Sequence, residues 1–214
     1  MGGEDKGLVQ VAGIPLYQHV LARLQPQVGS IAISANRNQA RYQESGLPAI
    51  GDLTTDFSGP LAGILAGLRY AATEWVVFVP CDVPDFPTTL VEQLWQQKGP
   101  ALAAYASDGE RAHPTLALLH TSLAPQLAGY LARGDRKLML FLDAAGARQV
   151  RSLVSKPHST TLIREKTACA GSRKKDSPMN NPHPPLLGIA AYSGTGKTTL
   201  LKQLIPLLRQ RKSE

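Results

Sequence analysis

The chain has 214 residues, 43% hydrophobic and 18% charged, enough to bury the core of one domain and to leave an appendage. No apolar run reaches membrane-spanning length and no secretory signal opens the chain, so we expect a cytoplasmic protein without a membrane partner. Its two cysteines, Cys81 and Cys169, lie far apart in the sequence, which fits a reducing compartment.

The net charge of +7 is divided unevenly along the chain. Residues 1–150 carry 11 Lys or Arg and 13 Asp or Glu, whereas residues 151–214 carry 12 and 3. The basic excess therefore belongs to the tail, and the body shows no electrostatic footprint for DNA or RNA. Because the tail also lacks the interleaved aromatic residues that stack on single strands, we expect no nucleic-acid partner.

Up to about residue 150, short apolar strands alternate with amphipathic helical stretches, which is typical of an α/β domain with a mostly parallel sheet. Helices are expected over residues 13–27, 59–73, 88–97, 122–134 and 135–146. Strands are expected over residues 30–35, 47–52 and 74–82, followed by an antiparallel pair over 101–107 and 113–120.

The chain beyond residue 150 follows a different pattern. Residues 151–185 have no sustained period and are rich in Lys, Arg, Ser and Pro, which predicts a disordered basic linker. Residues 186–214 again show a strand, a glycine-rich loop and an amphipathic helix. We therefore expect three parts: a nucleotide-binding body over 1–150, the linker, and a fragment over 186–214.

Two carboxylates follow predicted strands of the body. Asp52 ends "LPAIGD" and Asp82 ends "WVVFVPCD", at the strand ends where open α/β sheets bind ligands. A carboxylate there suits Mg²⁺ that carries substrate phosphates, and Lys6 with the Gly2–Gly3 turn could bind those phosphates. Taken singly, such an acid is more often a turn former or helix cap, and Lys6 a solvated lysine.

The stretches "MGGEDKGL", "ISANRNQ", "GDLTTDFSGPLAGI", "FVPCDVPDFP" and "DGERAHPTLAL" come in an order and spacing that resemble the molybdenum cofactor guanylyltransferases of the MobA type. The resemblance implies a three-layer, Rossmann-like nucleotidyltransferase fold. It also implies Mg²⁺-dependent transfer of GMP from GTP to the terminal phosphate of Mo-molybdopterin, giving the guanine dinucleotide cofactor and pyrophosphate. Further partners would be the molybdenum cofactor machinery and molybdoenzyme targets.

Carried over to this chain, the resemblance assigns site residues. Lys6 and Asp82 would be catalytic, with Lys6 on the GTP phosphates and Asp82 as the Mg²⁺ ligand. The nucleotide would also contact Gly2, Gly3, Asp52 and Ser34, the last standing where the family usually has an asparagine. The loop beside the substrates would be formed by Gly59, Pro60, Leu61 and Gly63, with Arg111 and His113 facing the pterin.

The family usually has a strand and an "LAGG" loop before the methionine that is Met1 here, and an "NxN" motif that is not visible here. We therefore expect a sheet that lacks its first strand, and weak or absent activity.

"AYSGTGKTT" resembles a Walker A loop, with Gly194, Gly196, Lys197 and Thr198 at the expected places between a strand and a helix. Residues 179–208 resemble the start of the MobB-type P-loop protein, so the strand, loop and helix are expected to stand apart as an orphan fragment. Two explanations account for the connection between the body over 1–150 and the P-loop fragment over 186–214: a frameshift near codon 150, or a natural fusion of two genes.

Two other functions stay open on the sequence. One is another nucleotidyltransferase of this fold, such as a cytidylyltransferase, because a fold does not fix a substrate. The other is a non-catalytic GTP-binding adapter that uses the C-terminal loop.

Overall fold

The computed structural model describes residues 5–51, 59–151 and 183–191. Its main sheet has seven strands in the order β4-β3-β9-β5-β7-β6-β8, and a separate hairpin pairs β1 with β2. The strands are β1 (Gln10–Val11), β2 (Ile14–Pro15), β3 (Ser30–Ser34), β4 (Ala49–Ile50), β5 (Trp75–Pro80), β6 (Ala103–Ser107), β7 (Ala112–His120), β8 (Arg148–Arg151) and β9 (Leu186–Ala191). The α-helices are α1 (Leu16–Leu24), α2 (Gln39–Gln43), α3 (Pro60–Tyr70), α4 (Leu90–Gln97), α5 (Ala124–Ala132) and α6 (Leu138–Ala144). Single 3₁₀ turns cover η1 (Lys6–Leu8), η2 (Gln25–Gln27) and η3 (Thr121–Leu123).

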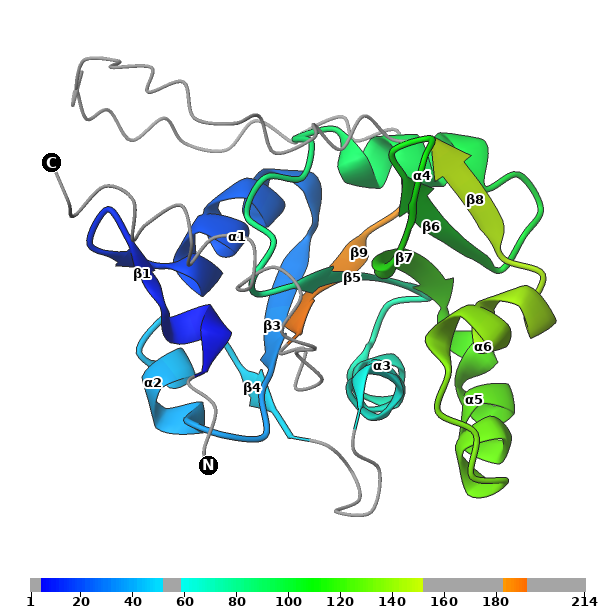
Figure 1. Cartoon of the computed structure of the whole chain (residues 1–214), viewed down its shortest axis with the longest axis horizontal. Coiled ribbons are helices and arrows are strands. Elements are labelled where there is room, and N and C mark those ends of the chain that lie inside the picture. Colours follow the sequence, from blue (N-terminus) through cyan, green and yellow to red (C-terminus); the bar gives the residue numbers. More distant parts are fainter. Residues whose placement is uncertain (1–4, 52–58, 152–182, 192–214) are drawn as a thin grey trace, which may run out of the picture.

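Helices cover both faces of the twisted sheet, which gives the three layers that the family resemblance implies (Figure 1). One apolar cluster joins α1, α2 and α4 to one face, and a second joins α3, α5 and α6 to the other. Along β5, Trp75, Val77 and Val79 belong to the first cluster, whereas Val76 and Phe78 belong to the second. This period of two means that β5 is buried on both faces, as its continuous apolar run predicts.

Most expected elements are confirmed, with shorter bounds. The helix expected over 13–27 is α1, preceded by Pro15, and the strand expected over 47–52 is reduced to the two residues of β4. The antiparallel pair is β6 and β7. Three features were missed: the short helix α2, strand β8, and the β1–β2 hairpin, whose turn residues Ala12 and Gly13 have φ of 53° and 80°. Both central residues of such a tight turn take positive φ, which glycine adopts without strain.

Strand β9 is the main correction to the expected architecture. It was expected to stand apart with the glycine-rich loop, and the sheet to lack a central strand. Instead, β9 lies in the main sheet between β3 and β5 and runs parallel to both (Figure 1). The local pattern of residues 186–191 predicts a buried strand but carries no information about its neighbours, and the backbone groups of such a strand need partners on both sides.

Across the three described ranges, no helix is long and apolar enough to cross a bilayer.

Candidate functional site

Four parallel strands end at one edge of the sheet. The register pairs Ser34 of β3 with Ile50 of β4 and with Ala191 of β9, and it pairs Ala191 with Pro80 of β5. The carboxyl ends of parallel strands are where open α/β sheets bind ligands. We call this row of strand ends the carboxyl edge.

Lys6 and Asp82 meet at the carboxyl edge, although 75 residues separate them in sequence. Asp82 follows the end of β5 by two residues, and Lys6 begins the 3₁₀ turn η1. The Lys6 Nζ lies 3.8 Å from the Asp82 Oδ2, and 36% and 24% of their side-chain surfaces remain exposed. This ion pair is long and partly solvated, so each group can still take another partner of opposite charge.

Asp5, a residue that the sequence analysis did not single out, fixes the position of Lys6. It is the N-cap of η1 and is only 9% exposed. Its Oδ1 accepts hydrogen bonds from the Gly7 amide at 3.1 Å and the Tyr42 hydroxyl at 2.7 Å, and its Oδ2 accepts one from Asn38 at 3.0 Å. The Asp-x-Gly spacing is a capping signal, but the two partners from the α2 region could not be read from it.

Gly7 brings η1 close to the end of β5. A Cβ at this position would lie 2.5 Å from the Tyr42 hydroxyl oxygen and 3.1 Å from the Cys81 Cβ. A larger residue would therefore push the turn, and with it Lys6, away from Asp82.

Cys81 is a packing residue at this edge. Its side chain is 1% exposed, and burial, with smaller contributions from the charges of Asp82 and Asp5, raises the pKa of its thiol well above the usual range. A thiol that stays protonated is a poor nucleophile. Cys81 therefore contributes packing at this edge rather than a nucleophile.

Several predicted site residues fall outside the described part of the chain. These are Gly2, Gly3, Asp52, Gly194, Gly196, Lys197 and Thr198. Of the remaining nucleotide-binding residues, Ser34 lies at the carboxyl end of β3 with only 4% of its surface exposed.

The residues predicted to form a substrate loop are mostly helical instead: Gly59 precedes helix α3, whereas Pro60, Leu61 and Gly63 lie inside its first turn. Gly59 is the helix N-cap with φ of 141°, a backbone conformation that favours glycine, and Pro60 is the first helical residue. Leu61 is 1% exposed and packs in the core with the rest of the buried α3 face, as does Gly63. Of the loop residues, Gly59 and Pro60 are thus the ones whose surface remains partly accessible.

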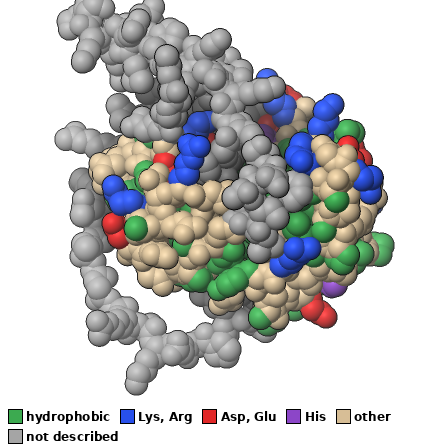
Figure 2. Space-filling model, turned by 90° about the horizontal axis from the view of Figure 1, so that it is seen from below, with side chains coloured by type: hydrophobic (Ala, Val, Ile, Leu, Met, Phe, Trp, Pro, Cys, Tyr) green, Lys and Arg blue, Asp and Glu red, His purple; other side chains and the backbone are tan. Residues whose placement is uncertain are grey.

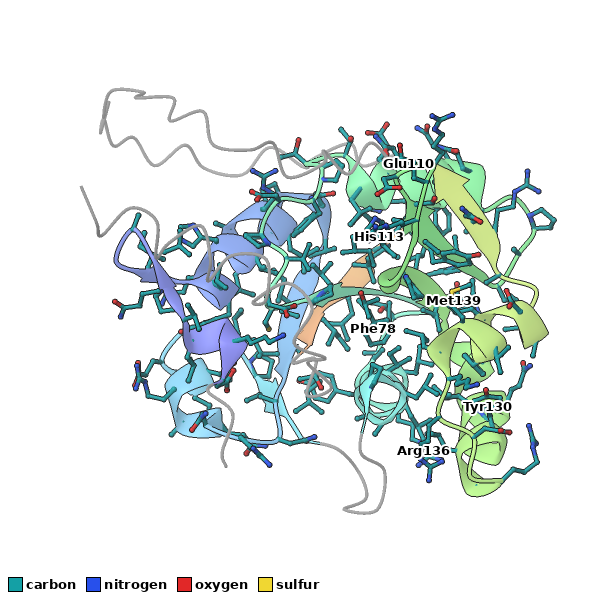
Figure 3. The ribbon with its side chains drawn as sticks, viewed as in Figure 1. Phe78, Glu110, His113, Tyr130, Arg136 and Met139 are labelled. Carbon is teal, nitrogen blue, oxygen red and sulfur yellow. The ribbon has the colours of Figure 1, made fainter. Side chains whose placement is uncertain are left out.

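Arg111 lies in the turn between β6 and β7, and His113 lies at the start of β7, so neither belongs to the Lys6–Asp82 pair. The His113 Nε2 lies 3.1 Å from the Asp108 Oδ2, and the Asp108 Oδ1 accepts hydrogen bonds from the Arg111 and Glu110 amides at 2.6 and 2.8 Å. These two amides, and then His113, hold the pKa of Asp108 at about 2, below its ordinary 3.8. Figure 3 shows His113 and Glu110 at this end of the sheet.

Metal binding at the carboxyl edge would depend on few protein ligands. Within the described ranges there is no group of three or more His, Cys, Asp or Glu side chains that could hold a metal ion. A Mg²⁺ ion that bridges substrate phosphates needs only one or two carboxylates, because water and phosphate oxygens complete its octahedron. The partly exposed Asp82 carboxylate fits that limited role.

The surface of the body agrees with its charge balance. On the face in Figure 2, basic side chains are scattered among acidic and hydrophobic ones and do not gather into one patch.

The described residues thus place a lysine and a carboxylate at the carboxyl edge of a three-layer α/β sheet, where sheets of this kind bind ligands. The profile of MobA-like NTP transferase domains matches residues 1–150. The chain is 83% identical to a molybdenum cofactor guanylyltransferase of Serratia proteamaculans over 150 residues. This alignment covers 70% of this chain and 76% of that protein. It is 64% identical over 151 residues to the Yersinia pestis (strain Pestoides F) protein of the same name, covering 71% and 77%.

A solved structure agrees with these relatives. The molybdopterin-guanine dinucleotide biosynthesis protein A of Archaeoglobus fulgidus superposes with a TM-score of 0.58 at 25% identity, covering 69% of this chain and 75% of that one. The chain belongs to the MobA-like NTP transferase family, which is a family of nucleotidyltransferases.

Proposed function

We propose that this chain is a molybdenum cofactor guanylyltransferase, which transfers GMP from GTP to the terminal phosphate of Mo-molybdopterin and releases pyrophosphate. The observation that carries the proposal is the Lys6–Asp82 pair at the carboxyl edge, within a 150-residue body 83% identical to a guanylyltransferase. Nucleotidyl transfer needs charge neutralisation and in-line positioning more than it needs a covalent nucleophile.

Lys6 and Asp82 have complementary roles in this proposal. Lys6 places its charge on the GTP phosphates, and Asp82 is the protein ligand of Mg²⁺. The metal, when bound, neutralises charge on the phosphate oxygens. When substrate binds, Lys6 exchanges its contact with Asp82 for a phosphate, and Asp82 exchanges its contact with Lys6 for the metal ion. The partial exposure of both side chains in the 3.8 Å ion pair permits this exchange. Asp5 holds the turn that carries Lys6 and is a positioning residue.

The remaining assignments follow the family resemblance. Asp52, Gly2, Gly3 and Ser34 contact the nucleotide, and the N-terminal turn of α3, with Gly59, Pro60, Leu61 and Gly63, lies beside the substrates. We assign the pterin side to Arg111 and His113, which Asp108 orients. Because the side chain of Leu61 is buried, its part in the loop is limited to its backbone.

We also propose that residues 186–214 derive from a P-loop protein of the MobB type. The chain leaves β9 at Ala191, which pairs with Ser34 and Pro80 at the carboxyl edge. The motif residues Gly194, Gly196, Lys197 and Thr198 follow within seven residues of that point. Their chemistry suits a second phosphate-binding loop, with the lysine as its point charge.

Turnover by the purified full chain tests the proposal. With Mo-molybdopterin and Mg²⁺, GTP should yield the guanine dinucleotide and one pyrophosphate per product, and CTP, UTP and ATP should yield at least about tenfold less, the discrimination expected when one base-specific contact is lost. A preference for CTP would identify a cytidylyltransferase instead.

Two variants separate an enzyme from an adapter. If the chain only binds nucleotide through its C-terminal loop, Lys197→Ala abolishes GTP binding and Asp82→Ala does not. The guanylyltransferase proposal requires the reverse: Asp82→Ala weakens Mg²⁺-dependent GTP binding, and Lys197→Ala leaves binding at the Lys6–Asp82 pair in place.

A further inference from the structure

Strand β9 lies at the centre of a sheet whose other strands all come from residues 30–151. The matched nucleotidyltransferase domain ends at residue 150, so β9 lies outside it in sequence. A central strand of this domain is thus supplied by a segment that is not part of the domain itself.

The two neighbours of β9 form a slot that its backbone fills. In register, Leu187 to Ala191 pair with Ser30 to Ser34 of β3, and Leu186 to Ala191 pair with Trp75 to Pro80 of β5. At the entrance, the Gly29 amide donates a hydrogen bond of 3.0 Å to the Leu186 carbonyl. An empty slot would leave two rows of backbone groups unpaired in the middle of a buried sheet, which is costly.

On the α1 face, the slot accepts only a small residue at the third position of the strand. A Cβ on Gly188 would lie 3.0 Å from the Leu24 Cδ2 and 3.0 Å from the Val28 Cγ2. Leu186 and Ala190, on the same face, are both fully buried. The slot therefore discriminates by side-chain size at Gly188.

On the α3 face, the slot instead accepts a large residue. Ile189 fills space that opens because Gly67 of α3 has no side chain: a Cβ on Gly67 would overlap the Ile189 Cδ1 and lie 2.7 Å from the Phe78 Cε1. Ile189 is fully buried, and Figure 3 shows Phe78 between the sheet and α3. The two faces together define a pattern, small at 188 and large at 189.

The segment before β9 has its own contact with the body. The His183 ring lies edge-on to Trp95 with 6.5 Å between the centroids, and Trp95 in turn packs edge-on to Trp75 at 5.3 Å. The Lys98 Nζ lies 4.2 Å from the centroid of the Trp75 ring. This aromatic group holds the entrance of the slot at the opposite end from the carboxyl edge.

We propose that the slot between β3 and β5 is a binding site for a parallel apolar strand, and that residues 183–191 of the same molecule are its ligand. The segment binds in cis, and its occupation of the slot completes the sheet that carries the Lys6–Asp82 pair. The inference concerns strand binding alone and is independent of which nucleotide the carboxyl edge takes.

Cleavage of the tether tests the proposal on the full chain. A specific protease site is inserted between residues 160 and 170, the 22.9 kDa protein is cleaved, and the products are followed by native mass spectrometry. The expected result is a monomer before cleavage and a 1:1 complex of the two fragments afterwards. Release of the C-terminal fragment, with the thermal unfolding of the body unchanged, would overturn the proposal, and so would a dimer whose copies exchange β9.

Competition and substitution then test the pattern of the slot. An excess of a synthetic peptide with the sequence of residues 183–191 should displace the cleaved fragment, and the same peptide carrying Gly188→Val should compete about 10- to 100-fold less well, because overpacking a tight site costs this much. Equal competition by the two peptides would contradict the size discrimination at Gly188. Since only the peptide is changed, folding of the body does not enter the result.

A matched control uses a glycine with room for a side chain. A Cβ on Gly129 of α5 would meet only the Arg133 Nη1, at 3.9 Å. The cleaved chain carrying Gly129→Val should retain its C-terminal fragment as the parent does, whereas Gly188→Val should release it. Release by both variants would mean that retention reports general stability, and the proposed slot would be wrong.

Discussion

Two aspartates contact basic side chains at different strand ends of the same sheet, and their surroundings differ. Asp82 meets Lys6 across 3.8 Å, with part of each side chain exposed. Asp108 meets His113 at 3.1 Å and accepts two backbone amides, so both of its oxygens have partners. The difference indicates that Asp108 holds a turn in shape, whereas Asp82 keeps the freedom to bind a metal ion or a phosphate-bound cation.

The largest expected effect is on the Asp82 side of this comparison. Asp82→Asn removes a charge without changing size, and GMP transfer should fall by at least about 100-fold because the metal loses its protein carboxylate. The melting temperature should stay within about 1 °C, as expected for loss of a partly exposed ion pair. Product formation and thermal unfolding measure the two quantities.

Asp85 supplies the control for that variant, since it is an exposed acid three residues further along the chain. Asp85→Asn changes the net charge equally and should leave transfer unchanged. Equal losses in Asp82→Asn and Asp85→Asn would remove the special role of Asp82.

Asp5 provides a second, structural test at the Lys6 end. Asp5→Ala leaves the Tyr42 hydroxyl, the Asn38 amide and the Gly7 amide without their carboxylate, which should lower the free energy of unfolding by about 2–3 kcal/mol. Urea denaturation measures it. A loss no larger than that of the exposed control Asp85→Ala would mean that the Asp5 network does not hold the turn.

The Asp108 side predicts a dependence of stability on pH. Because the folded pKa of about 2 lies below the ordinary 3.8, ionised Asp108 stabilises the fold fully above pH 4, and that contribution is lost as the pH falls through about 2. The melting temperature of Asp108→Ala should therefore lie below that of the parent at pH 6, and the gap should close as the pH approaches 2.

Asp135→Ala is the control for this pH series. Asp135 forms an exposed ion pair with Arg133 at 3.7 Å, whose contribution to stability should be small. If the difference in melting temperature between the parent and Asp108→Ala stays the same down to pH 2, the carboxylate charge is not what stabilises the turn.

The smallest expected effect concerns the buried thiol of Cys81, whose pKa is influenced by the charges of Asp82 and Asp5. In a chain carrying Cys169→Ser, Cys81 should not react with a thiol reagent at pH 8, because it is buried and its pKa is raised. In urea it should react fully. Rapid labelling of the folded chain would show that the end of β5 opens.

The sequence predicted the elements with strong local patterns. The continuous apolar run of β5 and the Gly-Pro entrance of α3 gave both elements within a few residues of their bounds. Four-residue β8 was missed because three of its four side chains are exposed and leave no apolar run. The position of β9 could not be predicted, since pairing between segments more than 100 residues apart is not encoded in a local period.

The candidate site was predicted in part. Lys6 and Asp82 were named from motifs, and the structure brings them together. Asp5 and Asp108 were missed because their roles come from partners that folding supplies: Tyr42 and Asn38 for the first, backbone amides of a tight turn for the second.

Lys6 and Asp82 are proposed to bind a guanine nucleotide together with Mg²⁺, and isothermal titration of GTP into the full chain tests this proposal most directly. Mg²⁺-dependent binding of GTP should be weakened in Asp82→Asn and should persist unchanged in Asp108→Asn. Binding of GTP that is indifferent to Mg²⁺ and to Asp82, or that is lost equally in both variants, would contradict the claim.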